Sequence, residues 1–429
     1  MTGTHKDTPM NRWVIAISGT VLQLCLGTIY AWSYFQKPLV ETYHWSNTQV
    51  AWVFSLAICC LGLAAAWGGL NLARFGPRTL AMAGGLLYGS GNLLAALALY
   101  LQSLPLLYIG FGILGGTGLG LGYVTPVATV AKWFPDKKGL VTGMVIMGFG
   151  FGALLMSKVL APSLMALTGG NLVLVFTFSG VALLMVATAC GAMLSNPPPD
   201  FSLPGIAAPA NSPANIASPA PPTPDAGNPL HSARFWMMWG VFFCNIVAGI
   251  AIIGFQSPML QDLLKPSHPN LAPASLATYG ATLIAVSSIF NGLGRFFWGG
   301  LSDRIGRVQT FRIILATQVV AFILLAWVAH PWLFAALICY VLLCYGGGFG
   351  TMPSFVLDTF GAARMPVVYG AILTAWSAAG IVGPQIVAWL KDHQPARAAT
   401  LAFLIGAGFL ATGFILSLRL SDRAMGNKR

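Results

Sequence analysis

An arginine lies deep inside an otherwise apolar stretch of this chain. Arg295 belongs to the segment Ala277–Trp298, which reads ATYGATLIAVSSIFNGLGRFFW. An arginine at the centre of a bilayer costs about 2.5–3.5 kcal/mol on insertion scales, so such a side chain normally has a partner. No Asp, Glu or His occurs in any stretch expected to span a membrane. We therefore predict that Arg295 binds a transported anion.

The alternative for Arg295 is snorkelling toward the headgroups at the end of its helix. The following loop is expected to begin near Ser302, which places Arg295 about 10 Å inside at a rise of about 1.5 Å per residue. A long arginine side chain can cover much of that distance. Asn291 lies one turn earlier on the same helix face and can orient the guanidinium or bond the anion. A structural asparagine whose amide bonds a neighbouring backbone explains Asn291 equally well.

Aromatic residues are the other candidates for this site. Tyr123 follows a glycine run, and Tyr345 and Phe349 bracket a similar run later in the chain. A buried phenol needs a hydrogen-bond partner, and a carboxylate can accept its bond. The competing explanation is that aromatic stripes in membrane helices are packing or lipid-facing surfaces. The remaining aromatic candidates are Phe149, Trp376 and Tyr30.

The elements that must position these residues are membrane helices. Of the 429 residues, 56% are hydrophobic and only 7% are charged, whereas soluble domains carry about 25% charged residues. Apolar runs of about 20 residues recur along the chain with helical periodicity, and each can cross a bilayer. We predict an all-α membrane protein with about twelve spans. The expected spans are Trp13–Phe35, Ser46–Gly69, Thr79–Tyr100, Leu104–Ala128, Leu140–Pro162, Asn171–Leu194, Phe235–Ser257, Leu276–Trp298, Thr310–Ala329, Trp332–Pro353, Val367–Leu390 and Ala398–Leu418.

The net charge of +12 is distributed unevenly between the two sides of the membrane. This bias indicates membrane topology rather than nucleic-acid binding, and it places both termini in the cytoplasm. The first apolar run has no small-residue cleavage site and is expected to be an anchor. The basic residues of the cytoplasmic side are Lys6, Arg12, Arg74, Arg78, Lys132, Lys137, Lys138, Arg234, Arg304, Arg307, Arg312, Arg364, Arg419, Arg423, Lys428 and Arg429. The other side has Lys37, Lys265, Lys391 and Arg397, with Lys158 near its boundary.

The cysteine and histidine content indicates neither a metal site nor a cofactor. All seven cysteines fall within expected spans, so we expect no disulfides, and no Cys/His cluster is present in the sequence. An enzyme would need paired acids, His or Cys near an interface, and a receptor would need an appended domain. Neither is visible in the sequence, so we expect a protein that is not an enzyme.

A Pro/Ala-rich segment divides the chain into two blocks of about six helices each. We predict a bundle at 1–194, a cytoplasmic linker at 195–233 and a second bundle at 234–429, because the composition of the linker offers almost nothing to bury. The blocks echo each other, since WGGL precedes Arg74, Gly76 and Arg78 in the first and Arg304, Gly306 and Arg307 in the second. Internal repeats of this kind are typical of secondary transporters, whose substrate site lies between the halves.

These motifs resemble those of the major facilitator superfamily. GGLSDRIGR at 299–307 is similar to the family's cytoplasmic loop motif, and GGLNLARFGPR at 68–78 fills the equivalent place, with Ala73 where the family usually has Asp. LGTIYAWSYF, KWFPDKKGL, NGLGRFFWGGLSDRIGR and MPVVYG resemble the oxalate/formate antiporter-like group. That group includes bacterial lactate and pyruvate carriers and is related to animal monocarboxylate transporters. The resemblance implies a monomer with twelve helices in two pseudo-symmetric six-helix halves, in the bacterial inner membrane.

The resemblance also bears on the substrate. Aligning Trp298 with Trp67 places Arg295 opposite Ala64, so the charge belongs to one half only and is attributed to the substrate rather than the fold. The oxalate carriers have an Arg on the eighth helix, which Arg295 matches, and a Lys on the eleventh, where this chain has Trp376. One cation suits one carboxylate, because an uncompensated charge in a low dielectric costs several kcal/mol. We expect a monocarboxylate of the lactate, pyruvate or formate class.

Three alternatives remain open at this stage. The first is an oxalate:formate-type exchanger of dicarboxylates. The second is a drug or sugar carrier, although the intramembrane acids or amides that these carriers use are sparse here. The third, from a different class, is a membrane enzyme or receptor, for which the features named above are not visible. The driving ion, a proton or a counter-anion, is also open, since the related animal carriers have an Asp at the position of Asn291.

Overall fold

The computed structural model describes residues 11–134, 136–198, 201, 229–361 and 364–421. Within these residues, twelve helical segments are long and apolar enough to cross a membrane, and every regular element is a helix. The prediction of an all-α membrane protein with twelve spans is confirmed. Three spans are composite, because short 3₁₀ or π-helical segments interrupt the α-helix in Arg12–Tyr43, Leu104–Trp133 and Val141–Leu167.

The first half comprises α1 to α9 and the second half comprises α10 to α15. The first-half elements are α1 (Arg12–Leu26), η1 (Gly27–Ala31), α2 (Trp32–Tyr43), α3 (Asn47–Phe75), α4 (Pro77–Tyr100), α5 (Leu104–Leu107), η2 (Tyr108–Gly115), α6 (Gly116–Trp133), α7 (Lys138–Leu155), η3 (Met156–Leu160), α8 (Ala161–Leu167) and α9 (Leu172–Ala192). The second-half elements are η5 (Pro229–His231), α10 (Ala233–Ser267), α11 (Pro273–Ile305), α12 (Arg307–Leu325), α13 (Pro331–Phe360), α14 (Met365–His393) and α15 (Ala398–Leu418).

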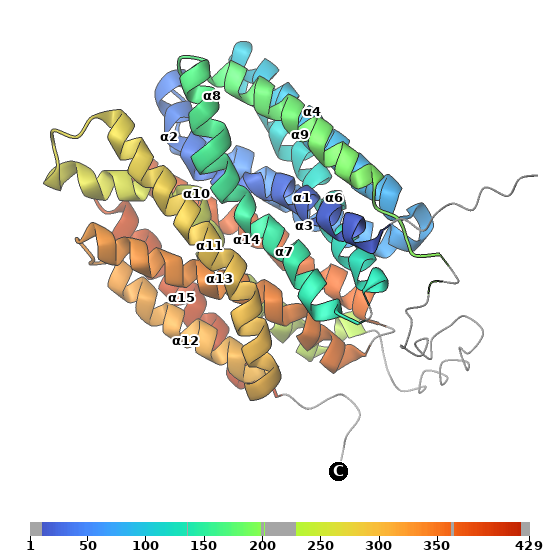
Figure 1. Cartoon of the computed structure of the whole chain (residues 1–429). Coiled ribbons are helices and arrows are strands. Elements are labelled where there is room, and N and C mark those ends of the chain that lie inside the picture. Colours follow the sequence, from blue (N-terminus) through green and yellow to red (C-terminus); the bar gives the residue numbers. More distant parts are fainter. Residues whose placement is uncertain (1–10, 135, 199–200, 202–228, 362–363, 422–429) are drawn as a thin grey trace, which may run out of the picture.

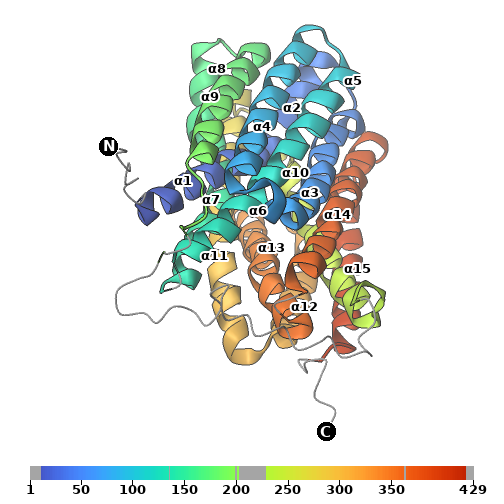
Figure 2. The same ribbon diagram turned by 90° about the vertical axis from the view of Figure 1, so that its right-hand side faces the viewer.

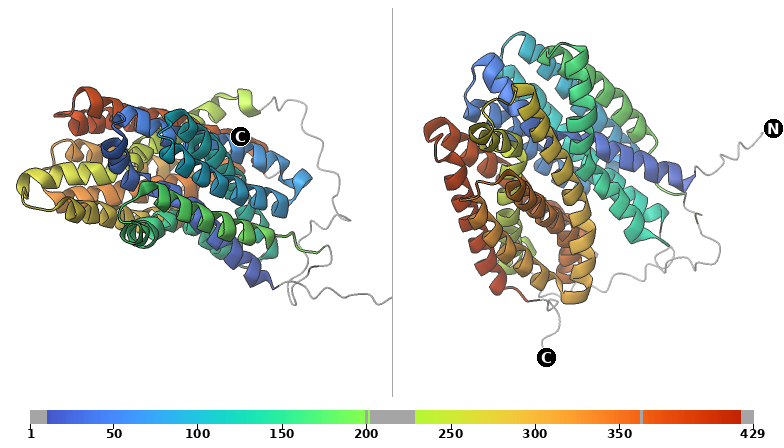
Figure 3. Two further views of the ribbon diagram at one scale, coloured as in Figure 1. Left: turned by 90° about the horizontal axis from the view of Figure 1, so that it is seen from above. Right: turned by 60° about the vertical axis from the view of Figure 1, so that its left-hand side comes forward.

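The two halves lie side by side as two groups of long helices (Figure 1). Within the first half, α4 packs on α9 and α6 packs on α3; within the second, α11 packs on α13 and α12 packs on α15. The halves meet mainly along α3 with α14 and α7 with α11 (Figure 2), and α2 also contacts α10. The helices of both halves run in broadly the same direction when the bundle is seen from above (Figure 3).

Close backbone approach at the α7–α11 contact depends on glycine. A Cβ atom added to Gly150 would lie only 2.8 Å from the Cα atom of Gly292, so α7 needs a residue without a side chain here. This crossing brings the backbone of the first half directly against the helix that carries Arg295.

Several helices extend beyond the predicted spans, and two of these extensions concern the site. The span predicted to end at Ser257 continues in α10 to Ser267, and α11 continues through Ser302 to Ile305. Ser302 is therefore not the start of a loop, and Arg295 lies about 15 Å from the end of its helix at about 1.5 Å per residue. Polar side chains such as Gln261 and Asp262 end the apolar run without ending the helix.

We call the end of the bundle where α9 ends and α10 begins the linker end, and the opposite end the far end. The start of α1 is tied to the α6–α7 loop at the linker end by an ion pair, in which Arg12 Nη1 lies 2.8 Å from Asp136 Oδ1. The hydrogen bond from Arg12 holds the pKa of Asp136 below its ordinary value. This contact is therefore kept at neutral pH and is lost as acid protonates the carboxylate.

The beginning of the predicted linker packs on the first half. Trp133 Nε1 donates to the carbonyl of Ser195 at 2.7 Å, and its ring centroid lies 5.0 Å from that of Phe201. At the other end, Ala233 is the first residue of α10. Most of the predicted linker, residues 199–200 and 202–228, lies outside the described residues, so the division at 195–233 stays a prediction.

Candidate functional site

The Arg295 side chain lies between the two halves. It is only 5% exposed although it is carried by α11, and Nη1 donates to Tyr123 Oη at 3.4 Å and to the Ile146 carbonyl at 3.3 Å. Both partners belong to the first half, on α6 and α7. The guanidinium on α11 therefore bridges the second half to α6 and α7 of the first half.

Two phenylalanine rings flank the guanidinium. Arg295 Cζ lies 5.8 Å from the ring centroid of Phe149 and 5.4 Å from that of Phe349. Phe149 comes from α7 and Phe349 from α13, so each half supplies one ring. Cation–π contacts of this kind stabilise a desolvated guanidinium by about 0.5–2 kcal/mol without neutralising its charge.

Part of the guanidinium has no hydrogen-bond partner. Arg295 Nε and Nη2 are buried donors without an acceptor among the described residues. These two atoms share one edge of the planar group, the edge that binds a carboxylate through two parallel hydrogen bonds. An unsatisfied buried donor costs about 1–3 kcal/mol, and more when it is charged. An anion that accepts hydrogen bonds from this edge would remove that cost.

The aromatic residues predicted from the sequence form one cluster around the arginine. Tyr30 Oη and Tyr345 Oη are 2.7 Å apart, which joins the halves through a phenol–phenol hydrogen bond. The Tyr123 ring contacts the Phe149 and Trp376 rings, with centroids 5.1 and 5.2 Å apart. Trp376 is fully buried, and its indole interacts with the Tyr345 phenol.

A small polar cavity adjoins this cluster on the side toward the far end. Its volume is about 10 Å³, close to the minimum for one water molecule. Asn291 lines it, is 1% exposed, and has an Oδ1 atom without a partner among the described residues. The other polar residues of the cavity wall are Tyr30, Gln256, Ser287 and Ser288.

The serines and the glutamine of this wall were missed from the sequence. Ser287 Oγ donates to Gln256 Oε1 at 2.7 Å, and Ser288 Oγ donates across the halves to the Gly150 carbonyl. Ser287 precedes Asn291 by one helical turn, and Arg295 follows by another, so the helical spacing was a usable signal. Tyr369 was missed as well and interacts electrostatically with Arg295.

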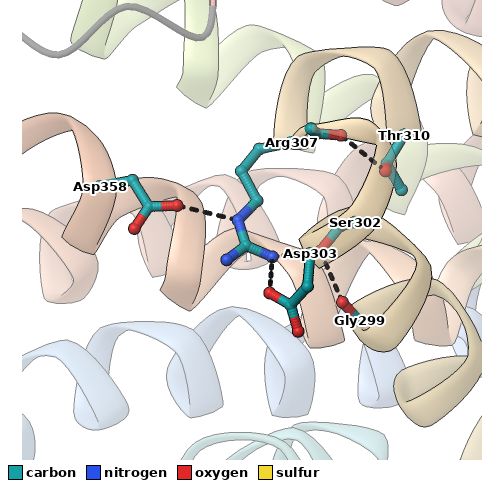
Figure 4. Close-up of polar contacts among 7 residues, drawn as sticks. Gly299, Ser302, Asp303, Arg307, Thr310 and Asp358 are labelled. Carbon is teal, nitrogen blue, oxygen red and sulfur yellow. Dashed lines mark hydrogen bonds and ion pairs between the residues drawn. The ribbon is translucent and has the colours of Figure 1, made fainter.

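The loop motif at the linker end forms a separate network in the second half (Figure 4). Arg307 lies 2.6 Å from Asp303 and 2.9 Å from Asp358, which connects the end of α11 and the start of α12 to α13. Gly306 ends α11 with φ 91°, and Gly76 ends α3 with φ 76°. Aligning these two glycines places Ala73 opposite Asp303, so the first half lacks the carboxylate that Arg307 uses.

Comparisons with known proteins agree with this architecture. A family model described as Major Facilitator Superfamily matches residues 16–384. The chain is 27% identical to the oxalate:formate antiporter of Oxalobacter formigenes, over 89% of this chain and 85% of that protein. It is 26% identical to human (Homo sapiens) monocarboxylate transporter 11, over 95% of this chain and 82% of that protein.

A solved structure has the same overall fold. It is a bacterial homologue of the human lysosomal transporter Spinster, in an inward-facing and occupied conformation. The TM-score is 0.68 at 15% identity, with 97% of this chain and 98% of that chain covered. At this identity the similarity extends to the fold alone.

Proposed function

Because this chain belongs to the major facilitator superfamily, whose relatives here are transporters and not enzymes, we propose that it is a secondary active carrier of a small monocarboxylate. The substrate is of the lactate, pyruvate or formate class, and it crosses the membrane by alternating access between the two halves. The observation that carries this proposal is the buried Arg295 edge, Nε and Nη2, which lies between the halves without a partner among the described residues.

The proposed binding mode uses this edge for the carboxylate. Two parallel hydrogen bonds fix the carboxylate plane, and the Phe149 and Phe349 rings exclude water from both sides. The phenol of Tyr123, now on Nη1 of Arg295, is close enough to donate to the same anion after a small shift. The cavity beside Asn291 has room for about one water, so the bound anion requires the surrounding side chains to move apart.

Trp376 favours a monoanion over a dianion. Its indole N–H can donate one neutral hydrogen bond but adds no charge. Arg295 would then balance a single carboxylate, whereas the second carboxylate of oxalate would remain uncompensated in a low-dielectric site. The relationship to an oxalate:formate antiporter keeps dicarboxylate exchange as the second candidate, and the relationship to a monocarboxylate transporter supports the first.

The carrier is proposed to lie in the bacterial inner membrane with its linker end in the cytoplasm. The excess of basic residues at that end supports this orientation. The driving ion is a proton or a counter-anion, and the neutral Asn291 beside Arg295 supports anion exchange or proton release from the substrate pair itself. We expect the functional unit to be a monomer.

Reconstitution of the purified chain in liposomes tests the proposal. We expect saturable uptake of labelled lactate, pyruvate or formate, with weak competition by oxalate. Uptake with and without a pH gradient, and with and without unlabelled anion inside, separates proton coupling from exchange. Protein-free liposomes give the background, and uptake of none of these anions above that background would overturn the proposed function.

Shortening the linker is expected to leave transport measurable. Residues 204–223 have a composition that cannot pack a core, so their removal should leave the structure of the two bundles unchanged. Uptake and membrane abundance are measured on the parent and on the shortened protein. Complete loss of uptake at normal abundance would show that the linker contains a structural or regulatory element.

A further inference from the structure

The far end of the bundle contains a carboxylate that joins the two halves. Asp392 lies near the end of α14 in the second half. Its Oδ1 accepts from Asn47 N and Asn47 Nδ2, both at 2.9 Å, and its Oδ2 accepts from Thr48 N at 2.8 Å. Asn47 and Thr48 are the first two residues of α3 in the first half.

These bonds complete the N-terminus of α3. The first N–H groups of a helix have no partner inside the helix. Ser46 and Gln49 form a capping box, which satisfies the Gln49 N–H and leaves those of Asn47 and Thr48. Asp392 takes both, and its negative charge lies at the positive end of the helix dipole. The cap of a first-half helix is therefore supplied by the second half.

We propose that Asp392 is a latch that holds the far end of the carrier closed. The halves must separate at this end in one of the two states of alternating access, and α3 and α14 form the most extensive contact between them. Separation removes the carboxylate from the α3 N-terminus and leaves two backbone donors and the Asn47 amide to water. The latch rests on the alternating-access part of the proposed function and not on the identity of the substrate.

Three further polar contacts cross between the halves on this side of the bundle. Lys37 Nζ donates to Gln261 Oε1 at 3.1 Å, and Lys158 Nζ donates to Thr282 Oγ1 at 2.6 Å. Gln385 Nε2 donates to Ser55 Oγ at 3.2 Å. None of them brings opposite charges together, whereas Asp392 makes three bonds with a full charge. At the linker end, the described ion pair Arg12–Asp136 lies within the first half, and Arg307–Asp358 lies within the second. The charged latch thus belongs to the far end.

The chain offers a matched control and a reciprocal variant. Asp262 lies at the same end and pairs with Lys391 at 2.5 Å, but both residues belong to the second half. Asp262→Asn removes a comparable charge without touching the contact between the halves. Asn47→Pro removes two of the three donors from the first half, and proline is favoured at the first position of a helix. It therefore weakens the latch without changing Asp392.

Hydrogen–deuterium exchange of the full chain in lipid nanodiscs tests the latch without any substrate. We expect amide exchange at the start of α3 to be about tenfold faster in Asp392→Asn than in the parent. The ends of α2 and α10, which the latch does not touch, should show the same increase. Loss of a charged hydrogen bond shifts the equilibrium between the closed and open far end by at least that factor. Peptides of the α6–α7 loop at the linker end should exchange more slowly. Asn47→Pro should repeat this pattern, and Asp262→Asn should not.

Two results would overturn the latch. If faster exchange is confined to the first turn of α3 in both latch variants, Asp392 is only a helix cap. If Asp262→Asn produces the same pattern as Asp392→Asn, the effect is one of surface charge. In either case the substrate assignment is unaffected, because uptake of labelled anions is measured separately.

Discussion

Arg295→Ala is expected to reduce uptake of the labelled monocarboxylate to the level of protein-free liposomes. The substitution removes the buried edge formed by Nε and Nη2, which has no partner among the described residues. Hydrogen bonds to a charged group contribute about 1.5–3 kcal/mol each, so the loss of two corresponds to a factor on the order of 10²–10⁴ in affinity. Arg295→Lys keeps the charge but cannot form the bidentate hydrogen bonds, so its uptake should lie between that of the parent and that of the alanine variant.

Stability and a second arginine control this experiment. Because Arg295 is a buried charge with two unsatisfied donors among the described residues, Arg295→Ala should not lower the thermal unfolding temperature. Arg312 is a suitable comparison, since it donates to the backbone carbonyl of Leu420 at 3.0 Å, away from the site. Arg312→Ala should retain most of the uptake. Uptake above half the parental rate in Arg295→Ala, at normal membrane abundance, would exclude Arg295 as the anion-binding residue.

The membrane spans could be predicted because the bilayer sets both length and composition. A run of about 20 apolar residues has few structures open to it in lipid other than a helix. The ends of α10 and α11 were predicted too early, because polar residues such as Gln261 and Ser302 interrupt the apolar pattern while the helix continues. Hydropathy reports what contacts lipid, and a buried polar face extends a helix without leaving that signal.

The site residues could be predicted where their residue type is rare in membrane helices, and they were missed where the type is common. A lone arginine in an apolar span is conspicuous, and the aromatic candidates gather around it in the structure. Ser287 and Ser288 were not singled out, because serine is frequent in membrane helices and bonds its own backbone there. The contact of Asp392 with Asn47 and Thr48 depends on how the two halves sit against each other. No local pattern in the sequence carries that information.

Trp376→Lys is expected to convert a site for monoanions into one that accepts a dianion. Trp376 is fully buried, and its ring centroid lies 4.7 Å from that of Phe349, which also flanks Arg295. A lysine here would place a second cation on the wall that faces the arginine. Oxalate could then pair one carboxylate with each cation, and a second charged hydrogen bond should lower its inhibition constant by about 10- to 100-fold.

The same substitution should weaken binding of lactate or formate, because a single carboxylate cannot compensate two desolvated cations. Trp376→Gln separates charge from volume: it removes the indole, keeps a neutral donor, and should not improve oxalate binding. Inhibition constants of oxalate and of the monoanions against labelled lactate or formate, measured on the parent and both variants, test this. Strong competition by oxalate in the parent would show that Arg295 alone suffices for a dianion, and the preference for monocarboxylates would then be wrong. If the lysine variant folds and oxalate still competes poorly, then Arg295 and the residue at position 376 do not contact the same bound anion.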